Sequence, residues 1–254
     1  MVGCLVSLLR MGVFLLLGPS LLATQTFPGR LDARQKRTAK KNHNPEISVL
    51  LHPLPCCRIF TVMITDAPPR RKNANSFRQS DRLDTLPLPP DSRLSRAAVQ
   101  IETAMHSGRI ESVRATAEQF LNLAADFYRV HPCDVRVLAA RPLRVREYST
   151  SELFGDYHPH TRLIRVWMKT AIRKEITSFG TFLSTLCHEF CHHLDFERFG
   201  YRDSWHTRGF YERTGALYHH AKGTPRKRIV WMPVRGRRFR INWSRTNCAP
   251  GKQD

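Results

Sequence analysis

The sequence lacks an unbroken apolar run long enough to cross a membrane. Its most apolar stretch, residues 1–26, is interrupted by Arg10, whereas a transmembrane helix needs about 20 consecutive apolar residues. A secretory signal peptide carries its positive charge before the apolar core, not inside it. We therefore expect no stable transmembrane anchor. Two interpretations of residues 1–26 stay open: a signal peptide, or sequence upstream of a true start near Met63.

Paired cysteine motifs are missing as well. The chain has seven Cys, an odd number, and it contains no C-x-x-C…C-x-x-C pattern, which excludes a zinc ribbon. The spacing does not resemble a secreted disulfide framework. Cys187 and Cys191 lie one helical turn apart among apolar residues, where we expect buried thiols. We therefore expect the protein in a reducing, cytoplasmic compartment. A secreted or periplasmic location is the alternative if residues 1–26 are a signal peptide.

Acidic residues are scarce. The chain has 41 Lys+Arg against 21 Asp+Glu, a formal net charge of +20, and no acidic residue lies between Arg213 and Gln253. A field of this sign attracts polyanions, including nucleic acid, anionic membrane surfaces and acidic proteins. Charge alone does not distinguish a binding surface from solvated basic tails.

The basic C-terminal segment, residues 222–254, predicts a β-hairpin around Gly236. Trp231, Phe239 and Trp243 are interleaved with its basic residues. Aromatic side chains of this kind can stack on unpaired nucleic-acid bases, or they can pack on a protein core. Because alternate residues of a strand face opposite sides, the sequence leaves both roles open.

The remaining chain divides by composition. Residues 27–91 are rich in Pro, Arg, Lys, Asn and Ser and contain Leu-Pro-Leu-Pro-Pro, which cannot be helical; we expect a disordered linker. Residues 92–221 have the apolar periodicity of a folded core. There, helices are predicted over 94–101, 110–130 and 209–219, and strands over 135–139, 143–148 and 163–168. Gly155 to His160 predicts a turn.

Thr185 to Asp195 contains the motif His188-Glu189-Phe190-Cys191-His192. Residues four apart on a helix lie one turn above each other, so His188 and His192 can present two imidazoles to one metal ion. Glu189 follows the first of them, where it can hold and deprotonate a water on the metal. Zinc is the expected ion, because it accepts nitrogen ligands tetrahedrally and keeps one position open when catalytic.

The context of this motif is helical. Apolar residues recur around it at helical spacing, Ser178 and Thr181 are candidate N-caps, and Gly200 is a candidate stop. The alternative is a buried helix with two hydrogen-bonded histidines and a surface Glu. His193 points about 100° away from His192, so we expect it not to share the ion.

A third ligand must come from elsewhere, and two candidates follow downstream. His206 lies in Ser-Trp-His-Thr-Arg-Gly-Phe, and Glu212 lies further along, where a second helix is predicted. A neutral imidazole is a common third zinc ligand, which favours His206. Glu212 would instead give the arrangement that thermolysin-like enzymes use.

The motif, the short linker and the His206 segment with Gly209 and Phe210 resemble the SprT-like (Spartan) zinc metalloproteases. That family follows H-E-x-x-H with a His in a segment resembling H-G-x-x-F; here Gly does not directly follow the His. The resemblance covers roughly Ala98 to Ala221 and implies an α+β, zincin-like fold. It also implies that the strand before the motif helix lines the substrate cleft and pairs with the substrate backbone. Eukaryotic members digest proteins crosslinked to DNA, and many carry a C-terminal zinc ribbon that this chain lacks.

Two functions of different classes follow as hypotheses. The first is a zinc-dependent metallopeptidase that hydrolyses a protein or peptide substrate, with His188, His192 and His206 as metal ligands and Glu189 as the base. Its substrates could include proteins associated with nucleic acid. The second is a basic nucleic-acid-binding protein whose zinc site is structural or vestigial.

Overall fold

The structure is a computed structural model that describes residues 7–13, 61–146 and 149–248. These residues belong to one of the two units into which contacts divide the chain. The expectations for residues 1–6 and for 14–60, including most of the candidate signal peptide, lie outside the described residues. Within the described residues, no helix is both long and apolar enough to cross a bilayer.

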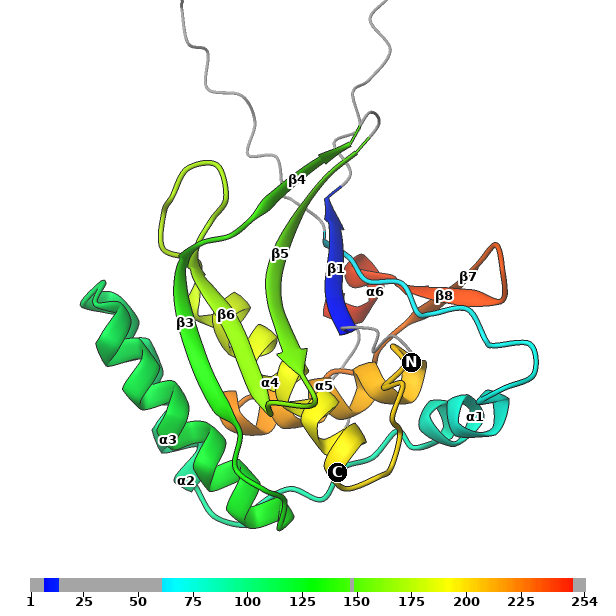
Figure 1. Ribbon diagram of the computed structural model, residues 1–254, viewed down its shortest axis with the longest axis horizontal. Coiled ribbons are helices and arrows are strands. Elements are labelled where there is room, and N and C mark those ends of the chain that lie inside the picture. The colour runs from blue at the N-terminus through cyan, green and yellow to red at the C-terminus, as the bar shows by residue number, and fades with distance from the viewer. Residues whose placement is uncertain (1–6, 14–60, 147–148, 249–254) are drawn as a thin grey trace, which may run out of the picture. The chain divides into compact units, whose positions relative to one another are not determined.

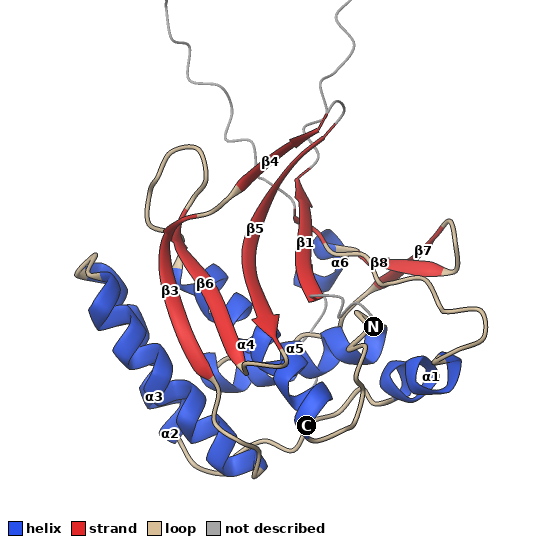
Figure 2. Cartoon of the chain, viewed as in Figure 1, coloured by secondary structure: helices blue, strands red, loops and turns tan. Residues whose placement is uncertain are grey.

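The fold is α+β (Figures 1 and 2). The helices are α1 (Ala74–Arg82), α2 (Arg93–His106), α3 (Ile110–Tyr128), α4 (Phe179–Glu197), α5 (Arg208–Lys222) and α6 (Trp243–Cys248). The strands are β1 (Ser7–Val13), β2 (Thr61–Val62), β3 (Asp134–Ala140), β4 (Leu143–Arg146), β5 (Ser149–His158), β6 (Leu163–Lys169), β7 (Trp231–Val234) and β8 (Arg238–Ile241). The helices and strands predicted for the folded core and the C-terminal hairpin are therefore confirmed, apart from their boundaries; β1, β2, β5, α1 and α6 were not predicted.

A mixed sheet forms one layer, with the strand order β2-β1-β5-β6-β3 and with β4 paired to β5. Strand β6 runs parallel to β3 and antiparallel to β5. The expectation that the strand before the motif helix is open to substrate is therefore wrong for Leu163–Val166, which pairs with a neighbour on both sides. An interior strand has no free backbone groups to offer.

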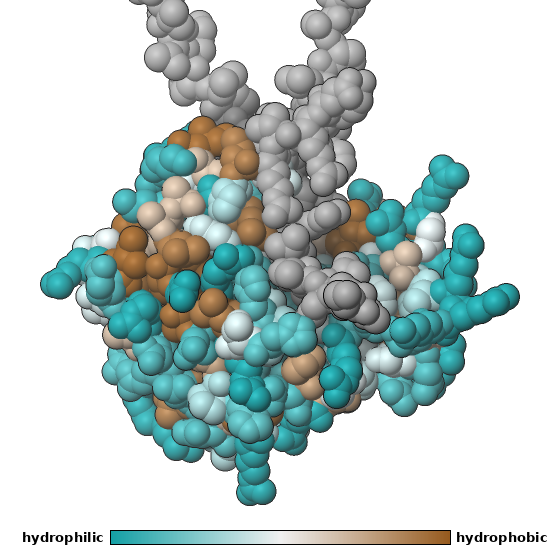
Figure 3. Space-filling view, in the orientation of Figure 1, coloured by the Kyte–Doolittle hydropathy of each residue, from teal (hydrophilic) through white to brown (hydrophobic). Residues whose placement is uncertain are grey.

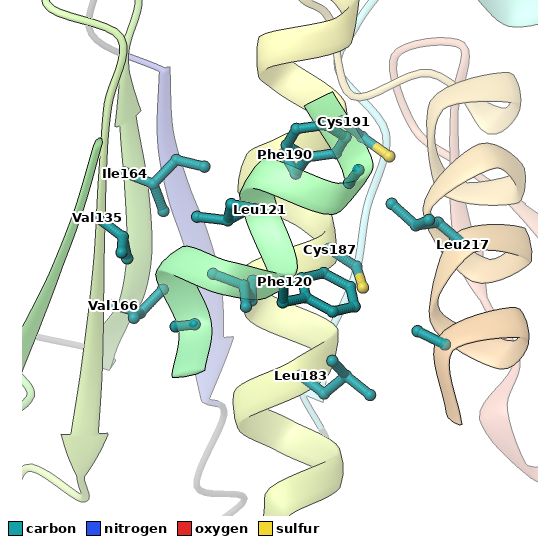
Figure 4. Close-up of a cluster of buried hydrophobic side chains, with 14 of the residues drawn as sticks. Phe120, Leu121, Val135, Ile164, Val166, Leu183, Cys187, Phe190, Cys191 and Leu217 are labelled. Atoms are coloured by element: carbon teal, nitrogen blue, oxygen red, sulfur yellow. The ribbon is translucent and has the colours of Figure 1, made fainter. Parts of the chain in front are cut away.

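The main core lies between the sheet and helices α3, α4 and α5 (Figure 4). Side chains from all these elements meet there, including Phe120 and Leu121 of α3, Val135 of β3, Ile164 and Val166 of β6, Leu183 and Phe190 of α4, and Leu217 of α5. Cys187 and Cys191 are buried among them as predicted, and burial raises the pKa of Cys191 to about 12. These thiols are neutral packing groups.

Helix α4 carries the metal-binding motif and is buried on almost every side. It starts at Ser178, whose hydroxyl accepts a hydrogen bond from the Thr181 backbone N–H (3.2 Å), and it runs for 19 residues. From Thr185 to Asp195 every side chain is buried, including five charged or ionisable ones besides the two cysteines. A helix with a single apolar stripe would expose those groups, so their burial requires partners.

The structure differs from the linker expected over 27–91. Helix α1 lies within that range and packs on α5: a Cβ on Gly209 would lie only 2.2 Å from the Ser80 carbonyl oxygen. Arg213 also donates to the Ser80 and Leu83 carbonyls, which satisfies two groups at the end of α1. Tertiary contacts therefore hold a helix whose own sequence is mostly polar.

The turn predicted from Gly155 to His160 is wrong at its start, because β5 continues to His158. Helix α4 packs closely against the strand at this position. A Cβ on residue 155 would lie 2.6 Å from Thr185 Cγ2 and 2.9 Å from Glu189 Oε1. Gly155 is required in the strand by close packing and not by a turn.

Candidate metal centre

Three histidines converge where α4 faces the start of α5. His188 Nε2 lies 3.1 Å from His192 Nε2 and 3.1 Å from His206 Nε2. The three residues can offer ligand atoms that all lie within 4.8 Å of one another. His188 and His192 are fully buried, and the His206 side chain is 13% exposed. The structure therefore brings together the three residues that the sequence selected.

The loop before α5 holds His206 in place from both ends. Thr207 is the N-cap of α5, and its hydroxyl accepts from the Phe210 N–H at 3.1 Å. On the other side, the Asp66 carboxylate accepts from the His206 backbone N–H at 2.8 Å and lies 3.3 Å from His206 Nδ1. Engaging Nδ1 leaves the Nε2 lone pair directed toward the other two rings.

Asp66 is a residue that sequence reasoning missed, because it lies in the range expected to be linker. Burial would raise its pKa, but the hydrogen bond and charge of His206 lower it overall. The segment around it is fixed to the C-terminal hairpin: Thr65 N–H donates to the Phe239 carbonyl at 2.8 Å. The only local signal for Asp66 in the sequence is a strand-like run just before it. No strand that could pair with this run is recognisable from the sequence.

A second chain of contacts fixes His192. Its Nδ1 lies 2.6 Å from Ser204 Oγ, which donates to Asp195 at 3.1 Å. Asp195 in turn accepts from Arg213 Nη2 at 2.7 Å, and both side chains are buried. Burial raises the pKa of Asp195 to about 6, although Arg213 and Ser204 act in the opposite direction. Asp195 lies three residues after His192 on α4, so its proximity could have been inferred from helical spacing.

The two buried imidazoles are neutral. Burial lowers the pKa of His188 well below its usual value, and the neighbouring His206 lowers it further. The pKa of His192 is also lowered well below its usual value, by burial and then by His188, His206 and Arg213. Neutral rings keep the lone pairs that a metal ion requires.

Glu189 places an unpaired carboxylate beside this cluster. The residue is fully buried, and neither carboxylate oxygen has a hydrogen-bond partner in the part of the chain that the structure describes. Burial raises its pKa well above the usual value, and the nearby charge of Asp156 adds to the shift. Asp156 itself is held by Arg165, with contacts of 2.7 and 2.5 Å. A buried carboxylate without a partner is costly, which makes Glu189 a candidate functional group.

The other candidate ligands lie elsewhere. Glu212 forms an ion pair with Arg226 at 3.0 Å and is not part of the histidine cluster. His193 lies 2.8 Å from the Tyr157 hydroxyl through Nδ1 and 2.8 Å from the His131 carbonyl oxygen through Nε2. These contacts agree with the expectation that His193 points away from the ion.

The cluster suits a tetrahedral metal ion. Nitrogen ligands about 2.0–2.1 Å from zinc at tetrahedral angles lie about 3.3 Å apart, close to the 3.1 Å contacts of His188 with His192 and His206. Imidazole nitrogens this close together repel one another through their lone pairs unless a proton or a cation lies between them. The donor set and its spacing therefore fit a divalent ion such as zinc.

Comparisons with known proteins add no relative. No protein-family model, curated protein or solved structure matches the chain. Functional assignment therefore rests on the residues and their geometry.

Replacing Asp66 by Ala is expected to weaken zinc affinity by about 10- to 100-fold, because His206 would lose the carboxylate that orients its ring. Competition with a fluorescent zinc chelator measures the change. Asp84→Ala, at an exposed acidic residue outside these contacts, is the matched control. Equal affinity in the two variants would show that Asp66 does not position His206.

Proposed function

We propose that the chain is a zinc-dependent metallopeptidase with a zincin-like, SprT-like core. The observation that carries this proposal is the buried, unpartnered carboxylate of Glu189 beside three converging imidazoles. A structural zinc site closes its fourth position with a protein ligand, whereas a catalytic site leaves it open for water. Among the described residues, the cluster contains three ligands and not four.

In this mechanism His188, His192 and His206 hold the ion. Bound zinc would lower the pKa of a water molecule and stabilise negative charge that develops on the peptide carbonyl oxygen. Glu189 accepts the proton of the attacking water on its carboxylate and then donates it to the nitrogen of the leaving amine. Burial raises the pKa of Glu189, which makes its carboxylate a stronger base toward the proton of the water.

The second candidate, a nucleic-acid-binding protein with a structural zinc site, rests on the β7–β8 hairpin. Arg235, Arg237, Arg238 and Arg240 are exposed there. Trp231 and Trp243, in contrast, are partly buried against the core, which favours packing over base stacking for these two rings. Binding through phosphates would weaken steeply as salt rises, so the salt dependence of oligonucleotide affinity tests this candidate. The peptidase could use the same surface to act on proteins associated with nucleic acid.

Metal content tests the proposed site directly. Purified full-length chain is expected to contain about one zinc per molecule by elemental analysis, in line with a single three-histidine site. His206→Ala should lose the metal, and Glu212→Ala should keep it, because Glu212 is paired with Arg226. Loss of zinc with Glu212→Ala alone would move the protein to a thermolysin-like arrangement. Folded protein that never binds zinc would exclude the enzyme.

A further inference from the structure

A basic cavity of about 500 Å³ lies outside the histidine cluster, and none of the three histidines lines it. Its walls come from the segment at residues 65–70, helix α1, the first residue of α5 and the β7–β8 hairpin. Figure 1 shows α1 and the hairpin on the same side of α5, and Figure 3 shows hydrophilic side chains over this part of the surface. The peptidase mechanism does not use the cavity, although one of its residues, Arg237, also belongs to the exposed arginines of the hairpin.

The lining is strongly positive. It includes five arginines, Arg70, Arg78, Arg82, Arg208 and Arg237, and a single acidic residue, Asp81. Asp81 is already bound by Arg208, at 2.5 Å between Oδ2 and Nη2. The other four arginines are exposed and form no salt bridge within the described residues. Uncompensated guanidinium groups around one cavity favour an anionic guest.

One wall is rigid. Arg208 is fixed by Asp81 through its backbone N–H and its side chain, and its guanidinium lies 4.5 Å from the centre of the Phe239 ring. Phe77 and Phe239 add an apolar surface to the same cavity. A guest with an aliphatic stem and a carboxylate end, such as Glu, matches this combination of apolar wall and guanidinium groups.

The cavity is continuous with the loop that holds the third histidine. Thr65 lines it, and the next residue, Asp66, binds His206. Arg208, on the opposite wall, lies two residues after His206. A peptide lying across the histidine cluster therefore has a basic cavity beside it within a few residues, since an extended chain advances about 3.3 Å per residue.

We propose that this cavity is a specificity subsite that binds an acidic side chain, Glu or Asp, of the peptide substrate near the bond to be cleaved. This inference rests on the proposed peptidase function, whose substrate class it specifies. A cavity of this volume has room for one or two side chains. A single-stranded nucleic acid would instead follow a groove over several nucleotides, so the position of the cavity beside the residues that hold and follow His206 favours a peptide.

The test uses full-length, zinc-loaded protein and fluorescein-labelled decapeptides in which a Glu-Glu pair is moved through an Ala/Ser sequence, with Gln-Gln peptides as matched partners. Binding to Glu189→Gln is followed by fluorescence anisotropy, and cleavage by the unmodified chain is followed by mass spectrometry. The Arg78→Gln/Arg237→Gln variant removes two exposed guanidinium groups of the cavity. Arg136→Gln, at an exposed arginine on β3 that does not line the cavity, removes a charge elsewhere.

At one or more positions, Glu-Glu peptides are expected to bind at least about tenfold more tightly than Gln-Gln peptides, as charge-assisted hydrogen bonds predict. The Arg78→Gln/Arg237→Gln variant should abolish that preference, and Arg136→Gln should keep it. Equal binding of acidic and amide peptides at every position would overturn the subsite. So would an oligothymidine whose binding requires Arg78 and Arg237 while peptide binding does not. Acid-selective binding without cleavage of any peptide would support the subsite and reject the peptidase.

Discussion

Glu189→Gln is expected to bind zinc normally and to lose peptide hydrolysis by a factor of about 100 to 10,000, the usual contribution of a general base. The amide has nearly the same shape as the carboxylate, and the three histidines do not depend on it for hydrogen bonds. It cannot accept a proton from water. Zinc content by elemental analysis and cleavage of an unstructured protein such as casein measure the two properties separately.

Glu175→Gln is the matched control, because Glu175 is exposed and lies outside the cluster. It should leave both zinc content and hydrolysis unchanged. Full hydrolytic activity in the zinc-loaded Glu189→Gln protein would show that Glu189 is not the base and that the mechanism is wrong.

Arg213→Met is expected to lower the free energy of unfolding by about 3–5 kcal/mol, the usual cost of leaving a buried charge without its partner. Arg213 is 1% exposed and Asp195 is fully buried, and the two are 2.7 Å apart. The same guanidinium binds the Ser80 and Leu83 carbonyls at the end of α1. Urea unfolding followed by circular dichroism at neutral pH measures the loss.

Two further variants test whether the loss of stability comes from the unpaired Asp195 carboxylate. Arg213→Met/Asp195→Asn should be more stable than Arg213→Met alone, because it no longer buries an unpaired carboxylate. Arg114→Met, which breaks the exposed pair with Glu118, should cost less than about 1 kcal/mol. If Arg213→Met is as mild as Arg114→Met, the buried ion pair does not stabilise the fold.

The two predictions concern different parts of one assembly. In the proposed mechanism Glu189 acts at the reacting atoms, whereas Arg213 contacts Asp195 and, through it and Ser204, orients His192. The Arg213→Met protein should therefore also bind zinc more weakly, because contacts that orient a metal ligand typically contribute 10- to 100-fold in metal affinity. This network contributes both to the stability of the fold and to the orientation of His192. A substitution that lowers the one is therefore expected to impair the other.

The parts of the site that depend on local geometry could be predicted from the sequence. His188, Glu189 and His192 lie within five residues of one helix, and helical spacing alone places the two imidazoles on one face. The cap at Ser178 and the apolar spacing predicted that helix, and the structure confirms it. The His206 context favoured this residue over Glu212, and the histidine cluster agrees.

The other contacts of the site could be recognised only in the folded protein, because they join residues far apart in the chain. Asp66 reaches His206 across 140 positions, and Arg213 reaches the end of α1 across 130. No periodicity within α1 or around Asp66 could reveal a partner that lies on α5 or in the loop before it. Gly155 looked like a turn residue until the packing of Glu189 against it showed why a strand needs glycine there. Local spacing and sequence context selected the three candidate ligands, and long-range packing supplied the groups that hold and surround them.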